Sequence, residues 1–450
     1  MPKVQPISDL RSERRRHGKA LRLKVPRASH GAWRPPADRP SVLEMLRSAN
    51  RGLSRGLLPI RYGRMSVSPF TFLRGAASVM ARDLAGTPIT GLAVQMAGDA
   101  HVGNFGLFAT PEREVVFDVN DFDETLPGPW EWDIKRLVAS LAVAARHHGF
   151  PRREVRRAVR VAARSYREHM QAYARARYLD TWYVHLDLST VARQVERLGQ
   201  RLFGAEVARA RARTQYHAFP HLVTVGGGRH RIRGHPPLIH RYRDPREERA
   251  VREAFERYRS GLSPERSRLL GRYHLEDVAE KVVGVGSVGT RCAVGLYLGD
   301  RDVLDPLFLQ LKEARRSVYE AWPGSSPITP HAERVVTGQR MIQEASDLFL
   351  GFSAAAGRSY YVRQLRDMKF ASEVTALTTK LRFGLADLCG ATLARAHART
   401  GDPAVIAGYL GTSEAFDEAL LRFALLYARQ TEKDFEEFQE AVKRGRLPIA

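Results

Sequence analysis

Two short turns of this sequence concentrate acidic and amide side chains, and each turn follows an apolar run typical of a buried strand. The first turn lies in AGDAHVGNFG at 97–106 and contains Asp99, His101 and Asn104. The second lies in VVFDVNDFDE at 115–124 and contains Asp118, Asp121, Asp123 and Glu124. Because acidic residues at neighbouring strand ends point into a shared space, we expect the two turns to share one acidic centre.

So many carboxylates repel one another unless cations lie among them, and hard oxygen ligands of this kind suit Mg²⁺. An aspartate in a tight turn can accept the proton of an attacking hydroxyl group. An amide oxygen and a strand-end carboxylate can bind a metal that also contacts phosphate, and together these groups are what phosphoryl transfer requires. The alternative is a pair of Asx-rich turns with a purely structural role.

A glycine-rich segment follows much later, in KVVGVGSVGTRCAVGLYL at 281–298. Its GxGxxG pattern is formed by Gly284, Gly286 and Gly289, with Ser287 inside it. A dinucleotide-binding fingerprint requires a helix directly after the glycines, whereas the residues here alternate as a strand does. We therefore predict a strand–turn–strand whose backbone N–H groups close over the phosphates of a nucleotide.

Lys312 lies on the next predicted strand, LFLQLKEA at 307–314, between apolar neighbours. A lysine in that setting is costly without an anionic partner, so we predict that it binds phosphate and is part of the catalytic machinery. The alternative is a lysine that snorkels at the strand edge. On the following helix, Glu333 is the expected carboxylate partner of Lys312, with Gln339 and Glu344 as rivals.

The first turn resembles the Brenner-type loop HGDxHxxN of aminoglycoside phosphotransferases and other kinase-like small-molecule kinases, except that Ala97 replaces the first histidine. VVFDV resembles the strand that carries their metal-binding aspartate. PGPWEWDIKRL at 127–137 resembles the segment in which a further aspartate begins a core helix. The chain also resembles, over most of residues 41–440, an uncharacterised bacterial family that carries GDAHxxNFG followed by FDxNDFDE.

The kinase-like resemblance implies a role for each matching residue. Asp99 is expected to be the catalytic base, and Asn104 is expected to serve both catalysis and Mg²⁺ binding. Asp118 is expected to bind Mg²⁺, with Asp121 beside it as a further metal ligand. Structural support for the loop is expected from two residues, His101 and Asp133.

The order of these motifs is unusual, because kinase-like enzymes place the glycine loop and lysine before the catalytic loop. Either one of the two matches is accidental or the fold is circularly permuted, and the complementarity of the two motifs favours permutation. We therefore predict an α+β, bilobal, protein-kinase-like fold with a large helical lobe and a small β-rich nucleotide lobe. The expected parts are a basic flexible arm (1–40), the large lobe with its catalytic and metal-binding loops (41–275), the nucleotide lobe (276–370) and C-terminal helices on the large lobe (371–450).

Composition excludes several other classes of protein. The 450 residues include 72 Lys and Arg against 49 Asp and Glu, a formal net charge of +23, and two cysteines. Two cysteines cannot form a disulfide framework or a zinc ribbon. The sequence has no apolar run long enough to span a membrane and no signal-peptide pattern at its start, so we expect a cytoplasmic protein with no membrane partner.

The leading hypothesis is an ATP- and Mg²⁺-dependent phosphotransferase that acts on a hydroxyl- or amine-bearing acceptor, either a small molecule or a protein. The first alternative is a pseudokinase-like protein that binds nucleotide without transferring phosphate. The second is a basic nucleic-acid-binding protein, which the +23 charge permits. The acidic residues of the most motif-like segment argue against that second alternative.

Overall fold

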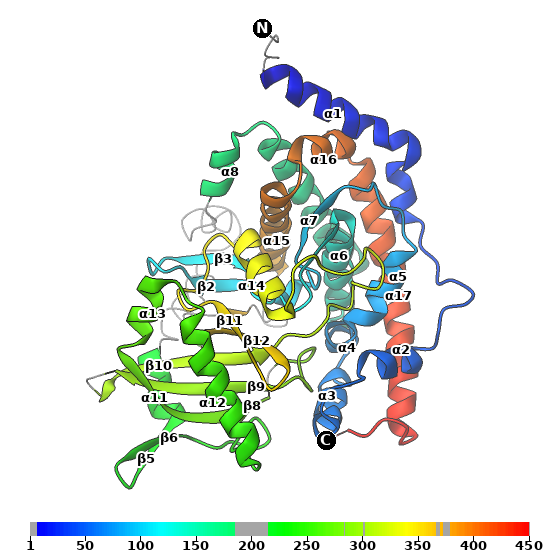
Figure 1. Ribbon diagram of the computed structural model, residues 1–450. Helices are drawn as coiled ribbons and strands as arrows, with labels where there is room; N and C mark the ends of the chain where they lie inside the picture. Colours follow the sequence, from blue (N-terminus) through cyan, green and yellow to red (C-terminus); the bar gives the residue numbers. More distant parts are fainter. Residues whose placement is uncertain are drawn as a thin grey trace.

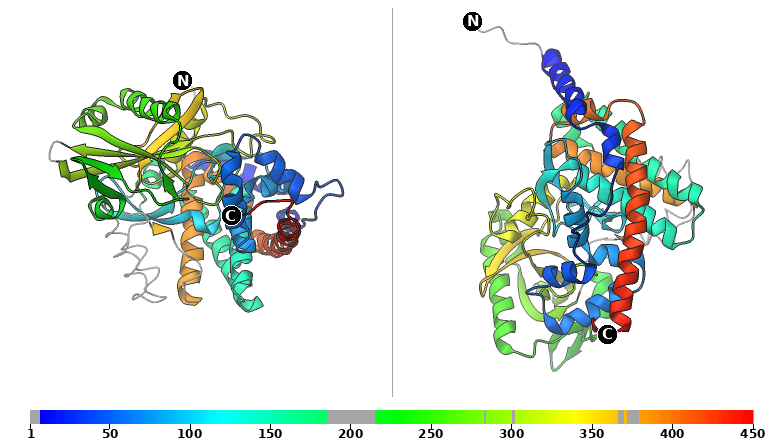
Figure 2. Two further views of the ribbon diagram at one scale, coloured as in Figure 1. Left: turned by 90° about the horizontal axis from the view of Figure 1, so that it is seen from below. Right: turned by 90° about the vertical axis from the view of Figure 1, so that its right-hand side faces the viewer.

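The computed structural model describes residues 7–184, 215–282, 284–299, 302–365, 370–371 and 379–449. Helices fill one side of the molecule and a six-stranded sheet lies on the other, as the views of Figure 1 and Figure 2 agree. The mixed α+β class expected from the sequence is therefore confirmed.

Short helices come before the first strand. Their bounds are α1 (Ile7–Lys24), α2 (Val42–Ala49), α3 (Leu58–Met65), α4 (Pro69–Gly75) and α5 (Ala77–Ala85), with single 3₁₀ turns at Arg27–Gly31 and Arg55–Leu57. Helix α4 begins at a capping box in which the Ser68 hydroxyl accepts from the Thr71 N–H and the Thr71 hydroxyl accepts from the Ser68 N–H. Such reciprocal capping fixes where a helix starts, and here it defines the backbone of a segment that reaches the site.

Two small antiparallel sheets carry the acidic turns. Strand β1 (Ala93–Met96) pairs with β4 (Leu126–Pro129), and β2 (Phe105–Ala109) pairs with β3 (Val115–Val119) and β13 (Phe370–Ala371). Strands β2 and β3 form a hairpin in which Gly106 lies opposite Asp118. Beyond the hairpin the Asn120 N–H donates to the Asn104 carbonyl at 2.8 Å, which holds the two acidic turns side by side.

Five long or buried helices form the main core. They are α6 (Trp130–His147), α7 (Arg152–Tyr173), α15 (Thr379–Thr400), α16 (Pro403–Leu410) and α17 (Ala415–Lys443), with a shorter α8 (Tyr178–Tyr183) beyond α7. Helix α6 is buried from Trp130 to Ala145, as expected of a helix that is apolar on nearly every face. Gly390 of α15 lets α7 approach closely, since a Cβ atom there would lie 2.4 Å from the Ala162 carbonyl oxygen.

The six-stranded sheet has the order β11-β12-β10-β9-β8-β7, with antiparallel neighbours throughout. The strands are β7 (Ile239–His240), β8 (Tyr273–Lys281), β9 (Cys292–Gly299), β10 (Asp302–Glu313), β11 (Gly351–Ala355) and β12 (Arg358–Gln364). Helix α14 (His331–Ile342) joins β10 to β11 and confirms the helix expected there. It lies between the sheet and the helical part in Figure 1.

Elements before residue 276 also pack on this sheet. Helices α12 (Pro245–Ser260) and α13 (Pro264–Leu270) share an apolar core with β8, β9 and β10, and α11 (Gln215–Leu222), β5 (Val223–Gly226) and β6 (Arg229–Ile232) share another. The sheet part therefore extends upstream of the boundary expected at residue 276. The mainly helical character expected up to residue 275 is also interrupted by strands, which are too short to show an alternating pattern. Residues 185–214 of that expected lobe lie outside the described residues.

The basic segment 1–40 is largely ordered from residue 7, so the prediction of a flexible arm is wrong. Helix α1 packs against α16, where Gly408 approaches α1 so closely that a Cβ atom would lie 2.3 Å from the Arg15 carbonyl oxygen. Arg22 donates to the carbonyls of Tyr409 and Gly408, and Arg27 donates to that of Leu410. The arginines that suggested a solvated arm instead satisfy the last carbonyls of α16, which have no partner within the helix.

None of the helices in the described ranges is both long enough and apolar enough to cross a lipid bilayer.

Candidate functional site

The turn at 97–104 is held by the first turn of the core helix α6. The Asp133 carboxylate accepts hydrogen bonds from the N–H groups of Ala97 at 2.6 Å and Gly98 at 2.9 Å. His397 of α15 lies 3.3 Å from the same carboxylate. Asp133 therefore contacts the backbone of the loop just before Asp99, which is where the resemblance to kinase-like enzymes places a supporting aspartate.

Asp99 is oriented by a buried arginine that the sequence analysis did not identify. One carboxylate oxygen of Asp99 accepts from Nε of Arg136 at 2.9 Å and from its Nη2 at 2.6 Å. The other oxygen lies 3.6 Å from Nε2 of His101. Asn104 donates its amide N–H to the Asp99 carbonyl at 2.7 Å, so the oxygen of that amide is not used in this bond.

His101 is buried, with 2% of its surface exposed, and its Nδ1 has no hydrogen-bond partner among the described residues. Burial, together with the positive charges of Arg74 and Arg136, lowers the pKa of His101 well below its ordinary value. The imidazole is therefore neutral at pH 7, which leaves Asp99 as the charged group of the loop.

Asp123 is the centre of the second turn. Its Oδ1 accepts from the Tyr361 hydroxyl at 2.8 Å, and its Oδ2 accepts from the Ser287 hydroxyl at 3.0 Å and from the ammonium group of Lys312. Asp121 lies beside them, 3.8 Å from the Lys312 ammonium. The structure therefore brings Lys312 and Ser287 of the second motif against the acidic turn of the first.

The charges in this cluster perturb one another. Burial and the neighbouring Asp123 carboxylate raise the pKa of Asp121. Although burial opposes it, the contact with Lys312 lowers the pKa of Asp123. Burial also opposes the charge on Lys312, but Asp121 and Asp123 raise its pKa well above the ordinary value. The cluster therefore holds two carboxylates, the ammonium group of Lys312 and the nearby guanidinium group of Arg363, and Asp121 keeps a raised pKa beside these cations.

Asp118 does not face this cluster, and its prediction as a metal ligand is wrong. Its side chain is fully buried on β3, where it forms an ion pair with Arg395 of α15. It also accepts from the N–H groups of Val119 and Glu344, each at 2.8 Å. Every residue of β3 is buried, so the end of this strand does not open into the cavity. Asp121, three residues later, is a predicted metal ligand that lines the cavity.

Glu333 is not the partner of Lys312, because the carboxylates that contact this lysine are those of Asp121 and Asp123. The next residue of α14, Arg334, faces the acidic turn instead and donates to the Asp123 carbonyl at 2.9 Å. One position along a helix turns a side chain by about 100°, and the sequence does not show which face meets the turn. The rivals have other partners: Gln339 donates to Gln343, and Glu344 pairs with Arg395.

The glycine segment forms the predicted strand–turn–strand, with β9 beginning at Cys292 and no helix after Gly289, so a dinucleotide-binding fingerprint is excluded. Gly284 and Gly289 have φ values of 66° and 103°, which favour glycine. Arg61 of α3 donates to the carbonyls of Val285, Gly286 and Val288, and Arg64 donates to that of Gly284. The C=O and N–H bonds of a planar peptide group point in opposite directions. Because these carbonyls point toward α3, the N–H groups that follow them lie on the opposite face of the turn.

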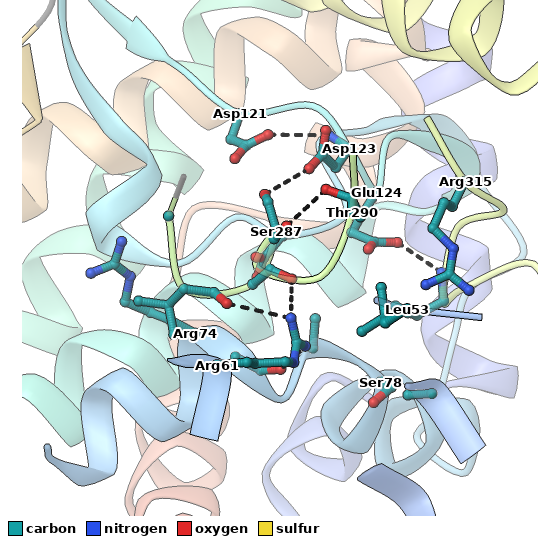
Figure 3. Close-up of a pocket in the computed structure, with 18 of the residues that line it drawn as sticks. Leu53, Arg61, Arg74, Ser78, Asp121, Asp123, Glu124, Ser287, Thr290 and Arg315 are labelled. Atoms are coloured by element: carbon teal, nitrogen blue, oxygen red, sulfur yellow. Dashed lines mark hydrogen bonds between the residues drawn. The ribbon is translucent and has the colours of Figure 1, made fainter. Parts of the chain in front are cut away.

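These segments enclose a cavity of about 170 Å³. Figure 3 shows the acidic side chains of Asp121, Asp123 and Glu124 on one side of the glycine turn and the arginines Arg61 and Arg74 on the other. Asp99, His101 and Asn104 of the turn at 97–104 also line it, together with the start of α5 at Ala77 and Ser78. The cavity thus joins an acidic wall, suited to cations, to a basic wall, suited to anions.

Within the described ranges, no three His, Cys, Asp or Glu side chains converge as a ready-made metal cage. Mg²⁺ in nucleotide-dependent enzymes is bound by one or two carboxylates, phosphate oxygens and water, so a cage is not what it requires. The Asp121 carboxylate, whose pKa is raised by burial and by the neighbouring Asp123, and the amide oxygen of Asn104 fit that mode of binding.

Arg136 and Tyr361 contact this site and were missed by the sequence analysis. Arg136 carries a signal that could have found it, because it is a charged residue inside the apolar stretch WEWDIKRLVASLAVAA of α6. An arginine buried in such a helix needs an anionic partner. Nothing local marks Tyr361, whose partner Asp123 is 238 residues away in the sequence.

The fold and site define a class of α+β protein in which a cavity with an acidic wall lies against a glycine turn, with a buried lysine paired to that wall. The model of one protein family matches residues 53–441, and its description is an uncharacterized protein conserved in bacteria (DUF2252). The chain belongs to this family, which confirms the resemblance to a bacterial family of that kind. No curated protein and no solved structure matches the chain.

Proposed function

We propose that the protein is an ATP- and Mg²⁺-dependent phosphotransferase with a circularly permuted, bilobal, protein-kinase-like fold. The acceptor bears a hydroxyl or amine group and is a small molecule or a protein. The observation that carries this proposal is the contact between Lys312 and Asp123, which lie 189 residues apart in the sequence. It ties the lysine strand to the acidic turn, and the glycine turn lines one cavity together with that turn and the turn that contains Asp99.

The succession of elements in the sheet part supports the proposal. Strand β8, the glycine turn, β9, β10 with Lys312 and then helix α14 follow in the order that protein kinases use for their glycine loop, lysine strand and next helix. One feature differs from that pattern, since Lys312 contacts the acidic turn and not a carboxylate of the helix.

The position of α15 supports circular permutation. This helix follows the sheet part in the sequence, and its last residue, Thr400, accepts a hydrogen bond from the Gln95 N–H of β1 at 3.2 Å. Strand β1 leads directly into the turn that contains Asp99. A chain in the usual kinase-like order would pass from the sheet part through α15 into β1, and the fold places these ends together.

The proposed reaction uses Asp99 as the base. The acceptor hydroxyl oxygen forms a bond to the terminal phosphorus of ATP, and the bond between that phosphorus and its bridging oxygen breaks. ADP leaves with the electron pair of the broken bond, and the hydroxyl proton passes to the Asp99 carboxylate oxygen that Arg136 does not bind. Arg136 keeps the other oxygen fixed and so orients the base.

Mg²⁺ would be held by Asp121 and the amide oxygen of Asn104, and it would supply the positive charge that neutralises the phosphates. Lys312, Ser287 and the N–H groups of the glycine turn would bind phosphate oxygens. A cavity of about 170 Å³ is smaller than the ~300 Å³ at which small-molecule sites begin. Nucleotide binding therefore requires the glycine turn to move away from Asp123. This is an opening motion of the kind that active-site loops make.

The test is a thermal-shift titration of ATP, with and without Mg²⁺, on the wild type, Asp121→Asn and the exposed control Asp38→Asn. We expect Mg²⁺-dependent stabilisation of the wild type and the control, and its loss in Asp121→Asn. If ATP and Mg²⁺ do not stabilise the wild type, the proposal is wrong.

A nucleotide-binding protein without transfer activity is the second candidate, and the pairing of Lys312 with Asp123 favours it, because this pairing leaves the lysine engaged. Release of ADP with added candidate acceptors separates the two functions. Asp99→Asn keeps nucleotide binding in both cases, but it abolishes turnover only in a phosphotransferase.

A further inference from the structure

Arg74, at the end of α4, differs from the other arginines that line the cavity. Arg61 donates to glycine-turn carbonyls, Arg315 donates to the Arg51 carbonyl, and Arg316 pairs with Glu320. Arg74 has no hydrogen-bond or ion-pair partner in the part of the chain that the structure describes, and its Nε is buried. Its guanidinium group lies over the ring of Phe70, at 5.9 Å from the centroid.

A guanidinium group carries five N–H donors, and leaving them unpaired in a protein interior costs free energy. Burial lowers the pKa of Arg74, and the charges of Asp99 and Asp121 oppose that effect, so the group stays cationic. A cationic, unpaired guanidinium that lines a cavity is the expected complement of an anion with several oxygens.

The backbone around Arg74 is held rigidly by two other arginines. Arg136, which binds Asp99, also donates to the Leu73 carbonyl at 2.9 Å. Arg61, which binds the glycine turn, also donates to the Gly75 carbonyl at 2.7 Å. The residues on both sides of Arg74 are therefore tied to the proposed base on one side and to the glycine turn on the other.

The position of Arg74 follows from these ties. A Cβ atom on Gly286, in the glycine turn, would lie 3.2 Å from the Arg74 carbonyl oxygen, and one on Gly103, in the catalytic loop, would lie 3.6 Å from its Nε. In Figure 3 the guanidinium group of Arg74 lies beside the glycine turn, on the far side from Arg315. It thus lies between the segment proposed to hold the phosphates and the segment that carries the proposed base.

We propose that Arg74 binds the terminal phosphoryl group of the nucleotide, as an arginine supplied by the same chain to stabilise the group being transferred. This assignment rests on the proposed function. A carboxylate or phosphate on the acceptor could supply the same oxyanion chemistry. A comparison of ADP with an ATP analogue distinguishes the two sources, because ADP lacks the terminal phosphoryl group.

The test compares the binding of ADP and of a non-hydrolysable ATP analogue, both with Mg²⁺, by isothermal titration calorimetry. The proteins are the wild type, Arg74→Gln, Arg74→Lys and the exposed control Arg82→Gln. We expect Arg74→Gln to weaken the binding of the ATP analogue about ten- to hundredfold, the range for a hydrogen bond to a charged group. The affinity for ADP should be unchanged. Arg74→Lys should recover part of the loss, and Arg82→Gln should match the wild type.

Unchanged affinity for both nucleotides in Arg74→Gln would overturn the assignment and place the anion on the acceptor. Equal weakening of both nucleotides would also overturn it. Thermal unfolding without ligand shows whether Arg74→Gln is folded, and Arg74→Lys, which keeps the charge, provides the comparison if it is not. If the wild type binds neither nucleotide, the proposed function fails together with this assignment, a result distinct from selective failure of the Arg74 variants.

Discussion

The ammonium group of Lys312 on β10 contacts the carboxylate of Asp123 in the turn after β3, and the same carboxylate accepts a hydrogen bond from Ser287 of the glycine turn. Lys312 is 2% exposed, so this pair is shielded from water on the lysine side. Asp123 thus accepts hydrogen bonds from Lys312 and Ser287, the donors that we propose for phosphate binding. It also connects the six-stranded sheet to the acidic turn.

Removing the lysine should destabilise the fold. We expect Lys312→Met to lower the free energy of unfolding by about 3 kcal/mol, because it leaves the buried carboxylates without their counter-charge. Adding Asp123→Asn should recover part of this loss, and a double-mutant cycle from urea denaturation measures the coupling. The exposed Lys443→Met is the control. Additive effects of the two substitutions would show that the pair contributes nothing.

Removing the carboxylate should free the phosphate-binding groups. We expect Asp123→Ala to bind inorganic pyrophosphate about tenfold more tightly than the wild type in the absence of Mg²⁺, since Ser287 loses its carboxylate partner and Lys312 keeps only Asp121, at 3.8 Å. Titration calorimetry at one fixed salt concentration measures this, with Asp38→Asn as the control. Weaker binding by Asp123→Ala would contradict the idea that Asp123 competes with phosphate.

Asp118 and Asp121 should behave in opposite ways. Asp118→Ala leaves Arg395 and Glu344 in a fully buried cluster without one carboxylate, and we expect a loss of about 3–5 kcal/mol in unfolding free energy. Asp121→Asn should change stability little and remove the Mg²⁺-dependent shift with ATP. Urea denaturation and thermal-shift titration of both variants provide the comparison. A stable Asp118→Ala that lost only the Mg²⁺ effect would restore Asp118 as a metal ligand.

His30 should make the fold sensitive to acid. It is 1% exposed and hydrogen-bonded to the Tyr409 hydroxyl at 2.6 Å, and burial, with the charge of Lys135, lowers its pKa from 6.5 to about 3. The unfolded chain therefore binds a proton at higher pH than the folded protein does, so stability falls as the pH drops from 6.5 toward 3. The loss should reach up to about 4 kcal/mol.

Urea denaturation at several pH values, on the wild type and His30→Gln, measures this contribution. We expect a shallower dependence on pH between 6.5 and 3 in His30→Gln, because glutamine keeps a hydrogen-bonding group near Tyr409 but does not titrate. Other buried histidines, such as His101, contribute to both proteins alike and cancel in the difference. Identical slopes would refute the assignment.

The docking of α1 should depend on small residues at its contact with α16. We expect Gly408→Val to detach α1, because the new side chain would overlap the backbone of Arg15. Limited proteolysis should then cleave within residues 7–24 faster than in the wild type. Gly56→Ala, where a Cβ atom meets nothing within 4 Å, is the control. Unchanged protection of α1 would show that the contact tolerates a side chain.

Features that depend on neighbouring residues could be predicted from the sequence. The hairpin after Asn104, the glycine turn, the strand with Lys312 and the helix at 331–342 all appear in the fold, because each is set by local backbone preference and by the spacing of apolar residues. The acidic character of the centre could also be predicted from the sequence, because the carboxylates of the second turn lie within ten residues of one another.

The partner of each charged residue was decided only by the tertiary structure. Asp118 and Asp121 are three positions apart on one motif, yet one is buried with Arg395 and the other lines the cavity. Arg334 faces the acidic turn where Glu333 was expected, and the arginines of the first forty residues bind helix carbonyls where a mobile arm was expected. An ion pair depends on which surfaces pack together, and that packing joins residues hundreds of positions apart.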